Sequence, residues 1–202
     1  MKALTSLLTH DHGSTDEMVH LCHEVFSGPP DLDPGTSPKW NERIKAKRII
    51  TEEMDARVSP WFEGAPMPNR LLTDRRCLPD DQGGELVFCN PGNDKQGKLV
   101  AFYWRTLVEF YMRGYARAVM YIAFNIEQGS RLQRVGARSS PFKNPTIVPA
   151  ERPEYLDGET LAPQTEPAHA SLITLLSHDP QHIRTFAALG RELGDVVNVH
   201  GY

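Results

Sequence analysis

The residues best suited to chemistry are an asparagine and a proline that directly follow an apolar run. The run is Leu-Val-Phe-Cys at 86–89, and Asn90, Pro91 and Gly92 come next. An asparagine carbonyl and the following backbone carbonyl can both accept hydrogen bonds from one amino group. Such contacts aim the nitrogen lone pair at an electrophile without a strong base. Because Asn, Pro and Gly are also the usual turn residues, a simple turn is the alternative.

Two acidic clusters stand earlier in the chain, each at the end of a short predicted strand. The first holds Asp31 and Asp33 and runs into a Gly-Thr-Ser turn, and the second holds Glu52, Glu53 and Asp55. A carboxylate of the first cluster can bind an ammonium group or hydroxyls of a cofactor. Carboxylates at the second can hold ribose hydroxyls or accept from an exocyclic amine. Because ligands bind beyond the carboxyl ends of parallel strands, we expect these clusters and Asn90 to lie together.

The elements that would position these clusters alternate between strands and helices. Apolar spacing and capping residues predict the helices, and short apolar or β-branched runs predict the strands. The alternation indicates an α/β sandwich around a mostly parallel sheet, in a single domain with loop insertions near 62–85 and 139–168. The expected helices cover 16–26, 38–47, 98–113, 125–135 and 180–193, and the expected strands cover 31–34, 48–51, 86–89, 116–124, 146–148, 171–176 and 195–199.

Composition is that of an ordinary soluble protein of 202 residues, with 40% hydrophobic and 24% charged residues. No apolar run approaches the roughly 20 residues needed to span a bilayer, and the first residues make a poor signal peptide. The three cysteines are widely spaced, which suggests no disulfide framework. We therefore expect a cytoplasmic protein with no membrane partner.

The net charge of −4 disfavours a protein that coats nucleic acid by bulk electrostatics, but it permits local contact through a basic patch. A solvated helix face is the alternative for the charges that could form such a patch. The candidates are Arg131, Arg134, Arg138 and Lys143.

Four histidines near the start of the chain suggest a metal site, because a His-x-His pair can chelate zinc. They are His10, His12, His20 and His23. No further ligand pattern completes a site, so we interpret them as surface histidines and predict no metal.

Taken in order, these motifs resemble the phage-type DNA adenine methyltransferase (Dam-like) family. That family shows a D-L-D-P-x-x-S element, a later Asn, an acidic stretch, a Trp-Gly step and a V-F-x-N-P-P motif. The counterparts here are 31–34, Ser37, Asn41, Thr51, Glu52, Asp55, Trp61, Gly64, Phe88, Asn90 and Pro91. Upstream, Thr15 matches a threonine of the family, and downstream 124–128 and 167–176 fit its later strands, so the resemblance spans about residues 12–177.

The resemblance implies a Rossmann-like fold that binds S-adenosylmethionine and methylates the exocyclic amine of adenine in DNA, in the bacterial host cytoplasm if the protein is phage encoded. The base would be flipped into the site, since the enzyme cannot reach it in the stack. Asn90, Pro91 and Gly92 would hold the target amine. The implied cofactor-binding residues are Thr15, Asp31, Asp33, Pro34, Ser37, Asn41, Glu52 and Asp55, and the implied substrate-binding residues are Tyr103, Trp104, Asn125 and Glu127.

The sequence departs from the family at one end of the catalytic motif. Gly92 and Asn93 stand where the family has a second proline and an aromatic ring that stacks on the flipped base. Stacking on a base is worth roughly 1–3 kcal/mol. Tyr103 and Trp104 are candidate replacements, and burial in the core is the alternative for both.

Two other classes of function stay open. One is a non-catalytic, methyltransferase-like protein that binds nucleic acid or another protein. The other is a methyltransferase whose acceptor is a different amine or amide, such as a glutamine side chain of a protein. Binding of S-adenosylmethionine separates an enzyme from a decayed relative, because a ligand that binds only the native state raises its stability.

Overall fold

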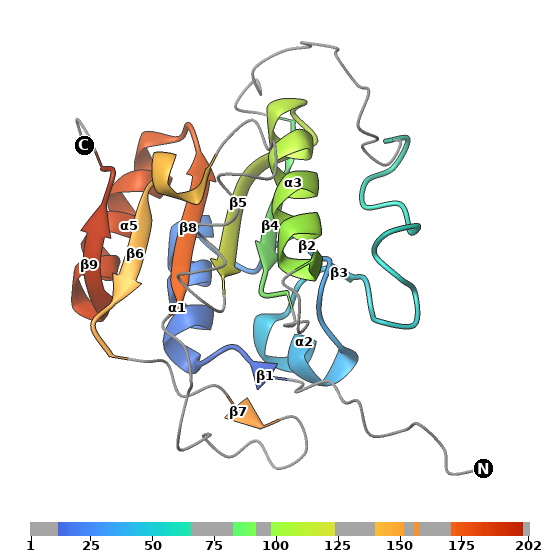
Figure 1. Cartoon of the computed structure of the whole chain (residues 1–202), viewed down its shortest axis with the longest axis horizontal. Helices are drawn as coiled ribbons and strands as arrows, with labels where there is room; N and C mark the ends of the chain where they lie inside the picture. The colour runs from blue at the N-terminus through green and yellow to red at the C-terminus, as the bar shows by residue number, and fades with distance from the viewer. Residues whose placement is uncertain are drawn as a thin grey trace.

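The computed structural model describes residues 12–65, 83–91, 98–123, 140–151, 156–157 and 171–199. These residues form an α/β protein with a seven-stranded mixed sheet flanked by four helices, and a separate two-stranded sheet (Figure 1). Within these ranges no helix combines the length and the apolar character that a membrane crossing requires.

One half of the large sheet is parallel. Its spatial order is β3 (Arg48–Ile49), β2 (Leu32–Asp33), β4 (Glu85–Cys89) and β5 (Ala116–Ala123). Helix α2 (Pro38–Ile44) lies between β2 and β3 in the chain, and α3 (Lys98–Met112) lies between β4 and β5. In the strand order β3-β2-β4-β5, the connection from β2 therefore leads to the neighbour on one side, and the connection from β4 leads to the neighbour on the other. The carboxyl ends of these two strands form a topological switch point, where α/β sheets bind ligands.

The other half of the sheet is antiparallel, which corrects the expectation of a mostly parallel sheet. Strand β8 (Leu172–Ser177) pairs antiparallel with β5, and β6 (Thr146–Pro149) and β9 (Gly194–Val197) continue the sheet in alternating directions. Every residue of β8 is buried. A strand covered on both faces shows a continuous apolar run whichever way its neighbour points, so the sequence pattern did not reveal this direction.

Helices cover both faces of the sheet. Helix α3 packs on one face, and α1 (Asp16–Phe26) and α5 (Pro180–Leu193) pack on the other (Figure 1). Alternate residues of β4 follow this division: Val87 and Cys89 join the cluster around α3, whereas Leu86 and Phe88 join the cluster around α1 and α5. This alternation is the two-residue period of a strand buried on both sides.

Side-chain caps define the helix starts. Thr15 caps α1 and Asp179 caps α5, and both helices begin and end where the sequence predicted. Helix α2 is capped by Ser37 but stops at Ile44, three residues short of the prediction, because Lys45 adopts a left-handed conformation with φ 58°. Helix α3 ends at Met112, one residue early.

The two-stranded sheet was not predicted. It joins β1 (His12–Gly13) to β7 (Leu156–Asp157) in antiparallel register. Gly13 is needed here, since a Cβ atom at this position would lie 2.1 Å from the Trp40 ring. The short 3-10 helix Pro141–Lys143 was also not predicted. The helix expected at 125–135 and most of the two expected loops lie outside the described residues.

Candidate functional site

The end of β2 carries a carboxyl group that is almost completely shielded from solvent. The Asp33 residue is 1% exposed, its Oδ1 accepts the Gly35 N–H at 3.2 Å, and the Thr36 hydroxyl also donates to the carboxyl. Burial raises the pKa of Asp33 to about 7, although the two donors work in the opposite direction. Among the described residues no cationic side chain pairs with Asp33. The group can therefore receive a positive charge from a ligand.

Other buried groups surround Asp33. Burial, and next the nearby charge of Asp33, raise the pKa of the thiols of Cys22 on α1 and Cys89 on β4. The Tyr103 hydroxyl on α3 donates to the Pro34 carbonyl at 3.0 Å. Burial raises the pKa of Tyr103 most, and the charges of Cys89, Asp33 and Asp55 raise it further. Tyr103 is thus within electrostatic range of the ends of β2, β3 and β4.

The end of β4 presents the predicted asparagine. Asn90 Nδ2 donates to the Ser14 Oγ at 2.9 Å, across 76 residues of sequence. Strands β2 and β4 are adjacent, with Leu32 paired to Val87, so the segments after Asp33 and Cys89 leave the same edge of the sheet. Helix α2 and β1 lie at that edge (Figure 1). The structure therefore brings Asn90 and Asp33 to one side of the sheet, as expected.

The segment after β3 is a compact loop. Asp55 has a left-handed backbone with φ 53°. Its Oδ1 accepts from Arg57 Nε at 2.7 Å and its Oδ2 accepts from Arg57 Nη2 at 2.9 Å. Hydrogen bonds from the Arg57 side chain hold the pKa of Asp55 below its usual range. Glu52 is exposed in the same loop, as are Met54 and Val58.

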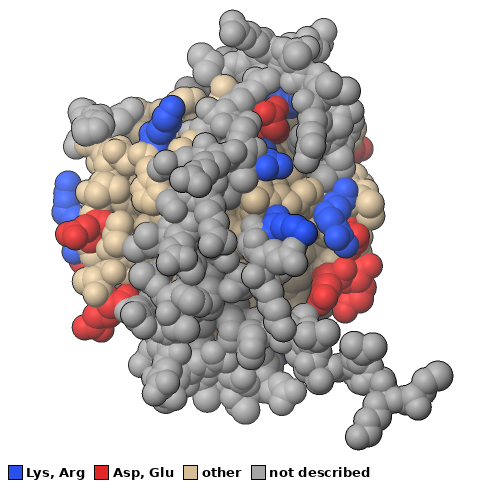
Figure 2. Space-filling model, in the orientation of Figure 1, with Lys and Arg blue, Asp and Glu red and all other residues tan. Residues whose placement is uncertain are grey.

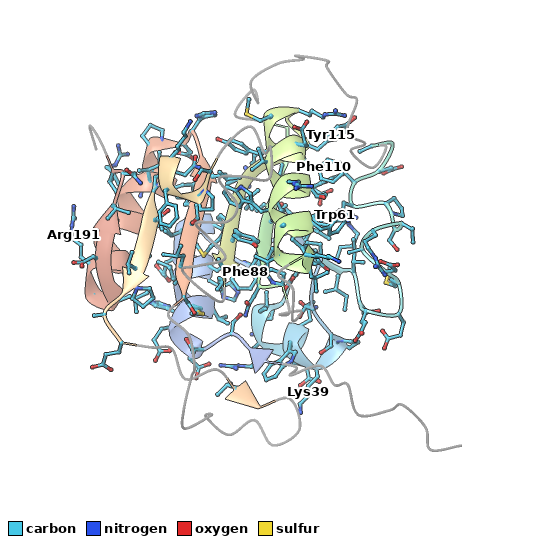
Figure 3. The ribbon with its side chains drawn as sticks, in the orientation of Figure 1. Lys39, Trp61, Phe88, Phe110, Tyr115 and Arg191 are labelled. Carbon is cyan, nitrogen blue, oxygen red and sulfur yellow. The ribbon has the colours of Figure 1, made fainter. Side chains whose placement is uncertain are left out.

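An aromatic cluster fixes this loop against α3. Trp61 is fully buried and its Nε1 donates to the Ala56 carbonyl at 2.7 Å. Its ring lies 5.6 Å from those of Tyr103 and Phe110, and Phe62 lies 4.7 Å from Phe110. Figure 3 shows Trp61 beside α3, the helix that carries Phe110. The Trp-Gly step therefore has a structural role: Trp61 packs against α3, and Gly64 has a left-handed backbone with φ 70°.

Several predicted cofactor residues have structural roles. Both Asp31 oxygens are engaged: Oδ1 by Lys47 at 2.6 Å and Oδ2 by the Leu86 N–H at 2.8 Å. Although burial alone would raise it, these contacts lower the pKa of Asp31. Asn41 is bonded at both ends of its amide to the backbone of Ala46, at 2.8 and 3.1 Å. We therefore leave Asp31 and Asn41 out of the candidate site.

Three other predicted cofactor residues lie at the same edge of the sheet, and each already accepts one hydrogen bond. Thr15 and Ser37 each cap a helix by accepting a backbone N–H, from Met18 and Trp40 respectively. Pro34 is buried and gives its carbonyl to Tyr103. The structure thus places these three residues next to the Asp33 segment and the start of α1.

The two aromatic candidates for base stacking are both buried. Trp104 is 0% exposed and packs on Tyr121, with ring centres 5.1 Å apart. It belongs to the core, and no accessible face is left for a base. Tyr103 is 7% exposed and its hydroxyl is bound to Pro34. Tyr103 therefore stabilises the segment after β2 through its hydrogen bond to Pro34 and has no free ring face for a base. Gly92, Asn125, Glu127, Arg131, Arg134 and Arg138 lie outside the described residues.

Two residues of the site were not predicted. Ser14 is 4% exposed and Arg57 is exposed. In the sequence Ser14 was an alternative to Thr15 as the cap of the first helix, and nothing indicated that it would meet a residue 76 positions later. Arg57 follows Asp55 by two residues, a spacing that permits the loop ion pair and that the acidic cluster obscured.

The predicted histidine and basic-patch residues form no common site in the described part of the chain. His23 Nε2 lies 2.8 Å from the Ile44 carbonyl, His20 is exposed, and His10 falls outside the described residues. No group of three potential metal ligands gathers within the described ranges. Lys143 is exposed in the 3-10 helix. Figure 2 shows both basic and acidic side chains on the described part of the face that is turned to the viewer in Figure 1.

A serine, a histidine and an aspartate meet at the start of α5. Ser177 Oγ lies 3.0 Å from His182 Nδ1 and accepts the Asp179 N–H at 3.1 Å, and Asp179 accepts the Gln181 N–H at 2.7 Å. His182 Nε2 is 3.7 Å from Asp179, too far for a hydrogen bond. Because the serine and aspartate oxygens accept backbone donors, this group caps the helix.

The fold and the site define an α/β protein with acidic and amide groups at a topological switch point. Comparison of the chain with protein-family models, curated proteins and solved structures gives no match. The resemblance of the ordered motifs to the phage-type DNA adenine methyltransferases therefore stays a prediction.

Proposed function

We propose that this protein is an S-adenosylmethionine-dependent methyltransferase that methylates the exocyclic amine of adenine in DNA. The observation that carries the proposal is the placement of Asp33 and Asn90 on adjacent strand ends at the switch point of the sheet. The ordered motifs described above support the same assignment. The finer description of the fold, a Rossmann-like methyltransferase fold, belongs to this proposal.

The residues at the end of β2 fit the cofactor. S-adenosylmethionine supplies a methyl group on a positively charged sulfur, and it also carries an ammonium group. Asp33 is a buried carboxyl with no cationic partner among the described residues, so a positive charge brought by the ligand would favour its ionised form. The exposed carboxylate of Glu52 would accept from ribose hydroxyls. Both oxygens of Asp55 already accept from Arg57, so Asp55 is left out of the proposed site, as Asp31 is.

The residues at the end of β4 fit the acceptor. The Asn90 carbonyl oxygen and the Pro91 backbone carbonyl would each accept one N–H of the target amine, which withdraws its lone pair from the ring and directs it at the methyl group. The new N–C bond would form as the S–C bond breaks and the demethylated cofactor leaves, and the methylated amine would then give its extra proton to water. No strong base is required at the site.

The test is to incubate the protein with DNA and S-adenosylmethionine that is labelled in its methyl group, and then to digest the DNA to nucleosides. We expect the label in N6-methyldeoxyadenosine. Thermal unfolding with and without the cofactor runs in parallel, because a ligand specific for the native state stabilises it by about 2.7 kcal/mol at 100 times its Kd. Stabilisation without labelled DNA would indicate a binding protein or another acceptor, and would contradict the proposed activity.

A further inference from the structure

We infer that Ser14 is a positioning residue that holds the Asn90 side chain by its amide nitrogen, so that the carbonyl oxygen faces the acceptor amine. This inference rests on the proposed function and adds to it a residue that neither the motif nor its spacing indicated. The contact that carries it is the hydrogen bond from Asn90 Nδ2 to Ser14 Oγ, at 2.9 Å.

The two ends of an asparagine amide have opposite hydrogen-bonding character. The nitrogen end only donates and the oxygen end only accepts. Because Ser14 takes a proton of the nitrogen end, Asn90 Oδ1 is left to accept from a ligand. In the reversed orientation a donor would face the donors of the target amine, and that contact would be lost. Orientation of the amide thus decides whether the end of β4 can hold an amine.

Ser14 is itself held firmly. It is 4% exposed, and its carbonyl accepts Arg43 Nη1 at 3.0 Å. Arg43 also pairs with Asp16 in the first turn of α1. On one side Gly13 lies against the Trp40 ring, and on the other Thr15 caps α1. The Ser14 hydroxyl is therefore fixed relative to α1 and α2 before any ligand binds, which is the condition for orienting another side chain.

A hydrogen bond that served only stability would also be lost in a Ser14→Ala variant, so the test needs readouts that stability does not change. The first is the pair of Asn90 side-chain NH2 signals in a ¹⁵N-labelled sample, assigned by comparison with Asn90→Ala. The second is the division of the activity loss between kcat and the affinity for S-adenosylmethionine. Ser140→Ala is the matched control, since the Ser140 hydroxyl also accepts one N–H, in this case that of the Phe142 backbone, at 3.3 Å.

We expect Ser14→Ala to shift the Asn90 NH2 signals and to lower kcat about tenfold, the size of one ordinary hydrogen bond, with the affinity for S-adenosylmethionine unchanged. Ser14→Thr retains the hydroxyl and should restore both readouts toward those of the unmodified protein. Ser140→Ala should leave both as they are. If Ser14→Ala fails to fold, the Ser14→Thr variant and the NMR signals of the unmodified protein in the presence of an adenine nucleoside carry the test.

The inference is overturned if the Asn90 NH2 signals are the same in Ser14→Ala, or if Ser14→Ala and Ser140→Ala lose kcat to the same extent. With the nucleoside, unchanged Asn90 NH2 signals would also overturn it, because a ligand N–H bound to Oδ1 polarises the amide and must shift the signals of its nitrogen end. If the unmodified protein methylates no adenine, the proposed function is refuted. If the Asn90 NH2 signals nevertheless differ between the unmodified protein and Ser14→Ala, the positioning role of Ser14 is still supported.

Discussion

At the scale of single residues, the site depends on a carboxyl group kept away from water. Asp33 is 1% exposed, and burial raises its pKa to about 7 from an ordinary value of about 3.9. The folded protein therefore binds this proton more tightly than the unfolded chain does. A cation that entered the site would expel the proton, so we expect binding of a cationic ligand to strengthen as the pH rises through 7.

The same pKa makes stability depend on pH. Because the folded pKa is the higher one, the stabilisation from the Asp33 proton is complete below about pH 4 and is lost as the pH rises to about 7. The difference between the two pKa values corresponds to about 4 kcal/mol. Asp33→Asn removes this dependence. In urea denaturation, the free energy of unfolding of Asp33→Asn minus that of the unmodified protein should increase between pH 4 and 7 and then level off. A difference that stays constant with pH would contradict the burial argument.

Asn90 has a different role from Asp33, and its removal should separate binding from transfer. Asn90→Ala deletes the carbonyl proposed to hold the acceptor amine, and loss of one such positioned group costs on the order of 100-fold or more in kcat. We expect methyl transfer to disappear while the thermal shift with S-adenosylmethionine survives. Loss of both together would indicate a folding defect and would contradict this division of labour.

At the scale of elements, the loop after β3 is held by aromatic packing and not by its own hydrogen bonds alone. Trp61 is 0% exposed and contacts the rings of Phe102, Tyr103 and Phe110. Trp61→Ala should lower the free energy of unfolding by about 3–5 kcal/mol, as large aromatic deletions in cores do. Urea denaturation measures the loss. Val58→Ala, at a position that is 73% exposed in the same loop, should change it by less than about 0.5 kcal/mol.

The segment before α1 is equally constrained, by a glycine. A Cβ atom at Gly13 would meet the Trp40 ring at 2.1 Å, so Gly13→Ala must displace either the ring or the strand that leads to Ser14. Overpacking of this kind costs about 1–3 kcal/mol. The matched control is Gly83→Ala, because a Cβ atom there meets nothing within 4 Å. Equal unfolding midpoints for the two variants would show that the contact with Trp40 is not needed.

The sequence predicted those elements whose signals are local. Thr15 or Ser14 was predicted to start the first helix and the Asp179-Pro180 pair the last, and the structure shows Thr15 and Asp179 as the caps. The direction of β8 depends on pairing with β5, 49 to 59 residues away along the chain, and a strand buried on both faces carries no sign of it. The same is true of the site: Asn90 was found from its motif, whereas its partner Ser14 depends on a tertiary contact.

At the scale of the whole molecule, the connections decide where chemistry can occur. The crossovers that contain α2 and α3 leave β2 and β4 toward opposite sides of the sheet. The backbone groups between the two strand ends are therefore not covered by either connection. In this region the Asn90 side chain, after β4, meets Ser14, before α1. The antiparallel half of the sheet adds buried apolar residues to the hydrophobic core, and α1 and α5 pack against the same cluster.

The measurement that tests this account most directly is the affinity for S-adenosylmethionine, determined by isothermal titration calorimetry at pH 8 for three proteins whose folding is first verified. We predict that the unmodified chain and Asn90→Ala bind the cofactor equally well, and that Asp33→Asn binds at least tenfold more weakly. No binding by the unmodified chain, or undiminished binding by Asp33→Asn, would contradict a cofactor site at the end of β2.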